Sequence, residues 1–118
     1  MQSFRSAEAA LQRNDLAAAQ KLAQKAVDGD PMQADYLVLL AWLQAQGGDA
    51  RAVAAAIGDI TNVLHDEPSN ERALLYRGKL FVRSNRAKEA AADFNELLAG
   101  NPNNRDAQAE LRAIKAKA

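Results

Sequence analysis

The residue types in this chain offer little for metal binding or catalysis. His65 is the only histidine among 118 residues, and the chain has no cysteine. Asp66 and Glu67 follow His65 directly, but a zinc site needs several converging nitrogen or sulfur ligands, and the chain has no other histidine and no thiolate. We therefore interpret His65 as a surface residue near the C-terminal end of a helix, where imidazole complements the helix dipole. No metal or cofactor is predicted.

Two other patterns could support chemistry. Asp15, Asp59 and the Asp66-Glu67 pair supply carboxylates, but no base partner accompanies them, so we expect them to solvate helix ends. The segment Gly47-Gly48-Asp49 is too short for a phosphate-binding loop and follows a predicted helix rather than a strand. We interpret it as a helix–helix turn. Because no nucleophile–base pair is evident either, we predict that the chain is not an enzyme.

Composition excludes further classes. The 15 basic and 15 acidic residues balance, so a general basic field for nucleic acid is absent. No apolar run approaches the ~20 residues that cross a bilayer, and residues 1–13 show no secretory signal. We therefore expect neither nucleic-acid binding nor membrane insertion. The lack of cysteine suits the cytoplasm, which is the predicted location, and is compatible with the periplasm if the chain belongs to a longer precursor.

Helical periodicity and helix-ending residues divide the chain into seven predicted helices and no strand. Prolines stand at positions 31, 68 and 102, and Gly, Asn and Asp cluster at the expected turns. The helix breaks are predicted near residues 13–15, 30–33, 47–49, 66–70, 84–86 and 100–104. The fold class is therefore all-α.

The segment from residue 71 to residue 102 carries the clearest pattern. Large, small and aromatic residues recur through it at fixed spacing: Leu74, Gly78, Phe81, Ala90, Phe94 and Pro102. Glycine inside a helix costs about 1 kcal/mol relative to alanine, which indicates that another helix backbone approaches closely at Gly78. This spacing resembles the tetratricopeptide repeat (TPR) family. One departure is Arg77, where the family usually has leucine, although a basic residue there is a familiar variant.

The resemblance extends along the chain. Pro68 and Pro102 are 34 residues apart, which is the repeat period, whereas Pro31 and Pro68 are 37 apart. Because the turns align, we place the three extra residues in the fourth helix. The resemblance implies a single domain over residues 1–118, an α-solenoid in a right-handed superhelix. Its parts are three hairpins at about 1–31, 34–68 and 71–102, and a capping helix at 104–118 with the apolar stripe Ala107, Leu111 and Ile114.

The resemblance also implies a binding groove, because TPR domains line a concave surface with the first helix of each repeat. The matching positions combine an apolar centre with a basic flank: Phe4, Glu8, Leu11, Asp35, Val38, Trp42, Arg72, Leu75, Lys79 and Arg83. Trp42 fits two interpretations equally, a groove residue or an ordinary core residue, since its helix is apolar almost all round.

The predicted function is a non-catalytic protein–protein interaction module that binds a peptide or helix of a partner in this groove. Some TPR domains grip the C-terminal carboxylate of Hsp70 or Hsp90 with Lys and Asn on their early helices. Here the matching positions hold Phe4, Glu8 and Val38, so binding of a chaperone tail is disfavoured. The alternative function is a self-association or spacer element within a larger protein.

Overall fold

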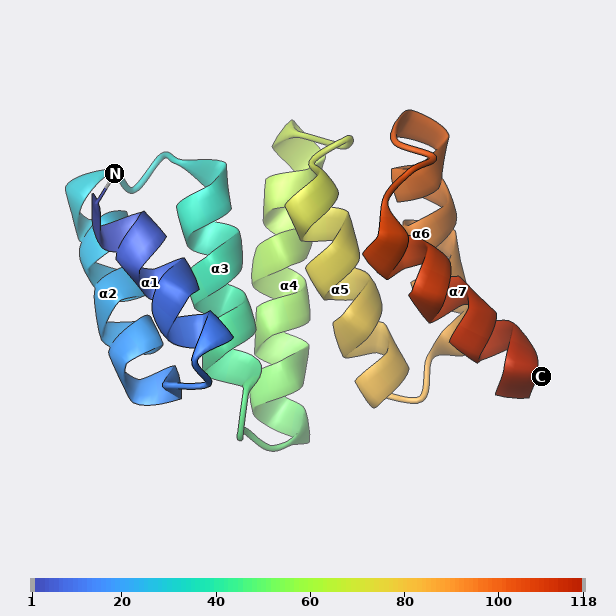
Figure 1. Ribbon diagram of the computed structural model, residues 1–118, viewed down its shortest axis with the longest axis horizontal. Helices are drawn as coiled ribbons and strands as arrows, with labels where there is room; N and C mark the ends of the chain where they lie inside the picture. The colour runs from blue at the N-terminus through green and yellow to red at the C-terminus, as the bar shows by residue number, and fades with distance from the viewer. Residues whose placement is uncertain (1, 118) are drawn as a thin grey trace. The chain divides into compact units, whose positions relative to one another are not determined.

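The computed structural model describes residues 2–117, which form seven α-helices and no strand (Figure 1). The helices are α1 (Gln2–Gln12), α2 (Leu16–Gly29), α3 (Ala34–Ala45), α4 (Ala50–Asp66), α5 (Glu71–Arg83), α6 (Ala87–Gly100) and α7 (Arg105–Lys117). All six predicted breaks and the all-α class are confirmed. Met1 and Ala118, the ends of the predicted domain and of the predicted capping helix, lie outside the described residues.

The turns inside the three hairpins share one backbone feature, a residue with a positive φ angle. Asn14, Gly47 and Asn85 each take a positive φ, of 60°, 74° and 61° respectively, two residues after their helix ends. Asparagine and glycine are the residues that tolerate this left-handed conformation best, which explains their presence at these three positions. The predicted equivalence of the three turns is thus visible in the backbone.

Polar side chains cap the starts of two helices. Asp15 Oδ1 accepts a hydrogen bond of 3.2 Å from the Ala18 amide at the start of α2. Asn70 Oδ1 accepts one of 2.9 Å from the Ala73 amide at the start of α5. Each bond satisfies one of the amides that the first helical turn leaves without an intrahelical acceptor. Local residues therefore set where these helices begin.

Helix α4 is the long one that the proline spacing predicts. It has 17 residues, against 14 in each of α2 and α6, the second helices of the other two hairpins. The three extra residues of the second repeat therefore lie in α4, as predicted.

The chain divides into two compact units, Met1–Asp59 and Ile60–Ala118, and the boundary falls within α4. In the first unit, α2 packs against both α1 and α3. The Gln20 side-chain amide joins α2 to α3 by donating to the Leu43 carbonyl at 2.9 Å. Alanines make up the buried part of α1 and α2, and four of them are completely buried: Ala7, Ala10, Ala19 and Ala23.

Helix α3 is buried on more than one side, as its composition predicts. Its buried residues are Ala34, Tyr36, Val38, Leu39, Ala41, Leu43 and Ala45. Successive residues of a helix are about 100° apart, so a set that includes neighbours such as Val38 and Leu39 occupies a wide arc of the helix. The half-buried and exposed positions that remain are where this helix meets solvent.

In the second unit, α6 packs against both α5 and α7. Larger side chains make this core: Leu74, Leu80, Phe81, Phe94, Leu97 and Leu111. Ala107 and Leu111 of α7 are buried as predicted, but Ile114, the third member of the predicted stripe, is only half-buried. Its exposed part borders a pocket between α5, α6 and α7.

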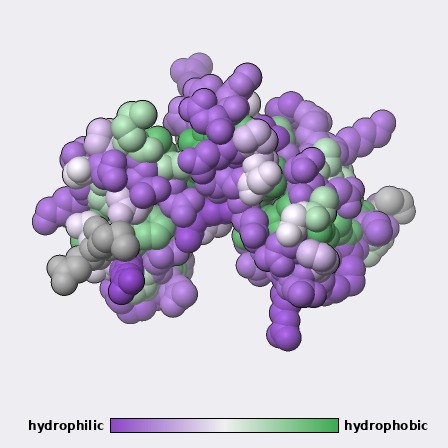
Figure 2. Space-filling view, turned by 90° about the horizontal axis from the view of Figure 1, so that it is seen from above, coloured by the Kyte–Doolittle hydropathy of each residue, from purple (hydrophilic) through white to green (hydrophobic). Residues whose placement is uncertain are grey.

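On the face of the molecule shown in Figure 2, hydrophilic side chains predominate, and apolar residues lie between them.

Candidate functional site

The contact between Gly78 and Phe94 sets how α5 lies on α6. Gly78 is buried, and a Cβ atom added to it would overlap the Phe94 ring, reaching 2.7 Å from Cζ and closer still to Cε1. Phe94 is completely buried, so the ring has little room to move. The close approach predicted at Gly78 is therefore real, but an aromatic side chain makes it rather than a helix backbone.

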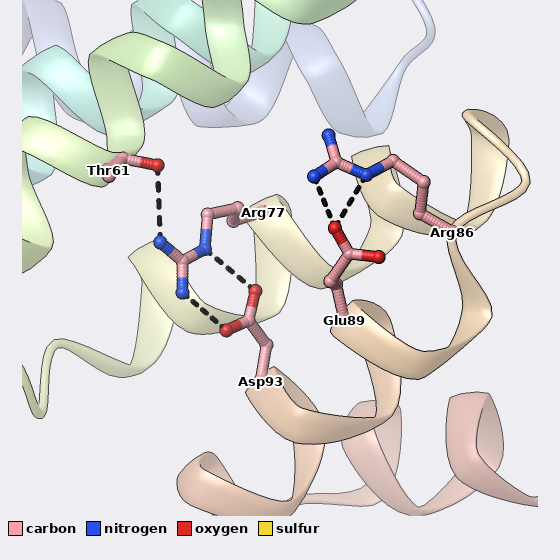
Figure 3. Close-up of polar contacts among 5 residues, drawn as sticks. All are labelled: Thr61, Arg77, Arg86, Glu89 and Asp93. Carbon is pink, nitrogen blue, oxygen red and sulfur yellow. Dashed lines mark hydrogen bonds and ion pairs between the residues drawn. The ribbon is translucent and has the colours of Figure 1, made fainter.

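An ion pair beside this contact joins the same two helices (Figure 3). Arg77 Nε donates to Asp93 Oδ2 at 2.8 Å, and Arg77 Nη2 donates to Asp93 Oδ1 at 2.6 Å. Arg77 Nη1 also donates to Thr61 Oγ1 of α4 at 3.2 Å. The guanidinium, which α5 carries, thus bonds to α6 and to the part of α4 that belongs to the second unit. Parallel bonds of this kind fix geometry as well as adding energy.

Asp93 is a buried carboxylate, with only 4% of the residue exposed. Its hydrogen bond raises the pKa of Arg77, an effect that burial partly opposes, so the guanidinium stays charged at any pH at which the protein is studied. The pair therefore accounts for Arg77, the residue that departs from the usual leucine of the family.

Sequence reasoning missed Asp93, although a signal was present. Ala90, Asp93, Phe94 and Leu97 follow the i, i+3, i+4, i+7 spacing of one helix face, and all four are buried. A lone carboxylate inside such a stripe indicates a buried partner, because an unpaired buried charge is very costly. Arg77 on the preceding helix was the available partner.

A second arginine reinforces the α5–α6 turn. The Arg86 guanidinium lies 4.7 Å from the centre of the Phe81 ring, and that of Arg77 lies 5.5 Å from the same ring. Arg86 Nε also donates to Glu89 Oε2 at 2.7 Å (Figure 3). Cations at these distances are attracted to an aromatic face, so Phe81 joins the two arginines.

These contacts orient the outer side of α5. Leu74, Gly78 and Phe81 are buried on one side, and Ala73 and Leu80 extend the buried arc. The residues about half a turn from Gly78 and Phe81 therefore lie away from this contact. We call this outward set the α5 face: Arg72, Leu75, Tyr76, Lys79 and Arg83. Arg83 is exposed and the other four are half-buried. All four α5 residues predicted for the groove therefore share one helix face.

Tyr76 joins this set from the structure. Sequence reasoning left it out, although it stands four residues after Arg72 and three before Lys79, which is the spacing of one helix face. The α5 face thus combines three cations with an aliphatic and an aromatic side chain.

The predicted site residues of the first unit lie on α1 and α3. The Phe4 ring packs against the Tyr36 ring, with centroids 4.8 Å apart and planes tilted by 33°. Phe4, Glu8, Leu11, Asp35 and Trp42 are all half-buried. Val38, in contrast, is completely buried, so its side chain belongs to the core and is not available to a ligand in this structure. The half-buried Trp42 is partly packed against the protein and partly exposed to solvent.

His65 was the remaining candidate for metal binding. His65 is exposed in the last turn of α4, where it was predicted. Over residues 2–117, no group of three or more His, Cys, Asp or Glu side chains is placed to hold a metal ion. Within the same range, no helix is both long and apolar enough to cross a membrane.

Comparison with known proteins identifies the class. The tetratricopeptide repeat family matches residues 4–56 and 49–105, and the chain belongs to this family. The family fold is generally a non-catalytic one for protein–protein interaction. No curated protein sequence matches the chain.

Solved structures agree on the fold. The TPR domain of Arabidopsis OM64 is 23% identical with a TM-score of 0.79, covering 98% of this chain and 93% of that one. The first TPR of Spaghetti (RPAP3), bound to the HSP90 peptide SRMEEVD, is 22% identical with a TM-score of 0.77, covering 98% and 89%. The first TPR domain of human RPAP3 is 22% identical with a TM-score of 0.79, covering 97% and 87%.

Proposed function

We propose that this chain binds a peptide or helix of a partner protein and that the α5 face is a main contact surface. The observation that supports this most strongly is the placement of Arg72, Lys79 and Arg83 on one outward side of α5. The opposite side is held by the Gly78–Phe94 contact and the Arg77–Asp93 pair. A preorganised surface loses less conformational freedom on binding, which favours affinity.

The chemistry of the α5 face indicates the partner. Helix α5 has four basic residues and one acidic residue, Glu71. Glu71 lies at the helix start, where it accepts a hydrogen bond from the Asn101 side chain at 2.9 Å. A segment with acidic residues beside an apolar one would match both the cations and the side chains of Leu75 and Tyr76. Arginine and tyrosine are also frequent energetic centres of interfaces.

The residues predicted on α1 and α3 are proposed as further ligand contacts of the first unit: Phe4, Glu8, Leu11, Asp35 and Trp42. Val38 is left out because it is buried. The half-exposed Trp42 offers a large amphipathic surface. If it contacts the ligand, Trp42→Ala should weaken binding by about 2 kcal/mol.

We also propose that the ligand is an internal acidic segment and not a chaperone tail. The related Spaghetti domain is bound to SRMEEVD, so this fold can hold an acidic peptide in that protein. In this chain, however, positions expected to grip a terminal carboxylate hold Phe4 and the acidic Glu8. SRMEEVD should therefore bind no better with a free C-terminus than with an amidated one.

The test uses an array of fluorescein-labelled acidic seven-residue peptides, read by fluorescence anisotropy. Lys79→Glu and Arg83→Glu should each weaken the best binders at least tenfold and reduce their salt dependence. Lys88→Glu, at an exposed position on α6, is the matched control and should change binding little. Circular dichroism checks that each variant keeps its helices.

Two results would count against the proposal. Equal binding by the parent and the Lys79→Glu and Arg83→Glu proteins would remove the α5 face from the site. Absence of any peptide binding, together with a size that grows with concentration in sedimentation, would favour the self-association function instead.

A further inference from the structure

A small pocket opens beside the α5 face within the second unit. Its volume is about 290 Å³, and it lies between the end of α5, the start of α6, and α7. Its apolar lining consists of Val82, Ala87, Ala113 and Ile114. Val82 and Ile114 are half-buried, while the two alanines are exposed. The space exists because alanines stand beside the two larger side chains.

Polar residues border this pocket. Asn85 lines it from the α5–α6 turn, and Glu110 and Lys117 line it from α7. Glu110 and Lys117 are seven residues apart, or about 10 Å along a helix. An apolar group in the pocket would therefore lie along α7 between the carboxylate of Glu110 and the ammonium group of Lys117. Glu110 would disfavour an acidic neighbour, whereas Lys117 would attract one.

The size of the pocket limits its occupant. An apolar protein cavity of about 150 Å³ can hold a benzene ring, so a pocket of about 290 Å³ suits one large side chain such as leucine, methionine or phenylalanine. Burying apolar surface of this kind is favourable without any specific hydrogen bond.

Val82 connects the pocket with the α5 face. Val82 follows Lys79 by three residues, so the two side chains are neighbours on the helix surface. One helical turn rises 5.4 Å, and an extended peptide advances about 3.3 Å per residue. An apolar residue in the pocket would therefore have the second residue along the peptide beside Lys79.

We propose that this pocket holds the apolar anchor of an acidic peptide bound by the α5 face. The partner motif has one large apolar residue with an acidic residue two positions away. Charge complementarity with Lys79 on the α5 face and with Lys117 at the other end of the pocket from Glu110 favours this occupant. The inference rests on the proposed function and adds to it the anchor pocket and the spacing of the ligand.

The test uses fluorescein-labelled peptides of seven residues that contain Glu-Glu-x-Leu among serines and glycines. Matched peptides replace the leucine by alanine or move it next to the glutamates. With the unmodified protein, the first peptide should bind at least fivefold more tightly than either variant. Equal affinity for the three peptides would overturn the inference, and this comparison requires no mutation.

Two protein variants separate the pocket from the charged face. Ala113→Phe should fill the pocket and weaken the leucine peptide at least fivefold, with little effect on the alanine peptide. Ala116→Phe, an exposed α7 position outside the pocket lining, is the matched control. Melting temperatures identify any variant that fails to fold.

The outcomes for the two proposals differ. If Lys79→Glu weakens all the peptides while Ala113→Phe weakens none, the pocket inference is wrong and the proposed function stands. If neither change affects any peptide, both are wrong. Loss of the leucine preference in Ala113→Phe alone would support the pocket as the anchor site.

Discussion

Arg77 and Asp93 form two parallel hydrogen bonds across the α5–α6 contact, with 20% of the arginine side chain and 6% of the aspartate side chain exposed. Removing one partner leaves a charged group without its main partner in a largely buried place. Asp93→Ala should therefore lower the free energy of unfolding by about 2–3 kcal/mol. Urea denaturation monitored by circular dichroism measures this loss.

The control for this pair is a double-mutant cycle. Arg77→Leu restores the residue that the family usually has, and combined with Asp93→Ala it leaves no unpaired charge. The double variant should be more stable than the sum of the two single losses predicts, by about 1 kcal/mol or more. Strict additivity would show that the two residues do not stabilise the fold as a pair.

Gly78 provides a test of packing. Gly78→Leu should destabilise by about 1–3 kcal/mol, because the new side chain overlaps the Phe94 ring in a filled core. Gly58 is the matched control: it lies inside α4, is exposed, and has nothing within 4 Å of an added Cβ. Gly58→Ala should stabilise by about 0.5–1 kcal/mol through helix propensity. A melting temperature of Gly78→Leu equal to or above that of the parent would contradict the contact.

Helix α7 is expected to act as a cap on α6. Deleting residues 105–118 should uncover the side of α6 that packs against α7, with Phe94 and Leu97 as the apolar side chains expected to become exposed, lower the melting temperature and promote association. Leu111→Ala is a milder control that should cost about 2–3 kcal/mol and leave the protein monomeric. Analytical ultracentrifugation measures the association, and thermal melts measure the loss of stability. A truncated chain that stays monomeric and equally stable would refute the capping role.

The effect of substituting Asn14, the residue with a left-handed backbone in the first turn, should depend on how well the new residue tolerates a positive φ. Asn14 has a φ of 60°, so Asn14→Ala should cost about 1 kcal/mol because a Cβ without polar compensation is disfavoured there. Asn14→Gly should be neutral or slightly stabilising. The comparison is made by urea denaturation, and equal stability of the two variants would show that backbone strain at this turn is unimportant.

The sequence by itself determined the helices, their ends and the repeat. Helix ends depend on residues within a few positions, such as Asn85 in its left-handed turn and Asn70 at the start of α5, so local chemistry is sufficient to place them. The extra length of α4 followed from the proline spacing for the same reason.

Only the tertiary structure decided how deeply individual side chains are buried and which partners they meet. Helix α3 is apolar almost all round, so its periodicity could not separate the buried Val38 from the half-exposed Trp42. Asp93 pairs with Arg77, which lies sixteen residues earlier on another helix. Ile114 lines a pocket together with Ala87 and Ala113. Burial depends on side chains from elsewhere in the chain, whereas periodicity reports only the helix that carries it.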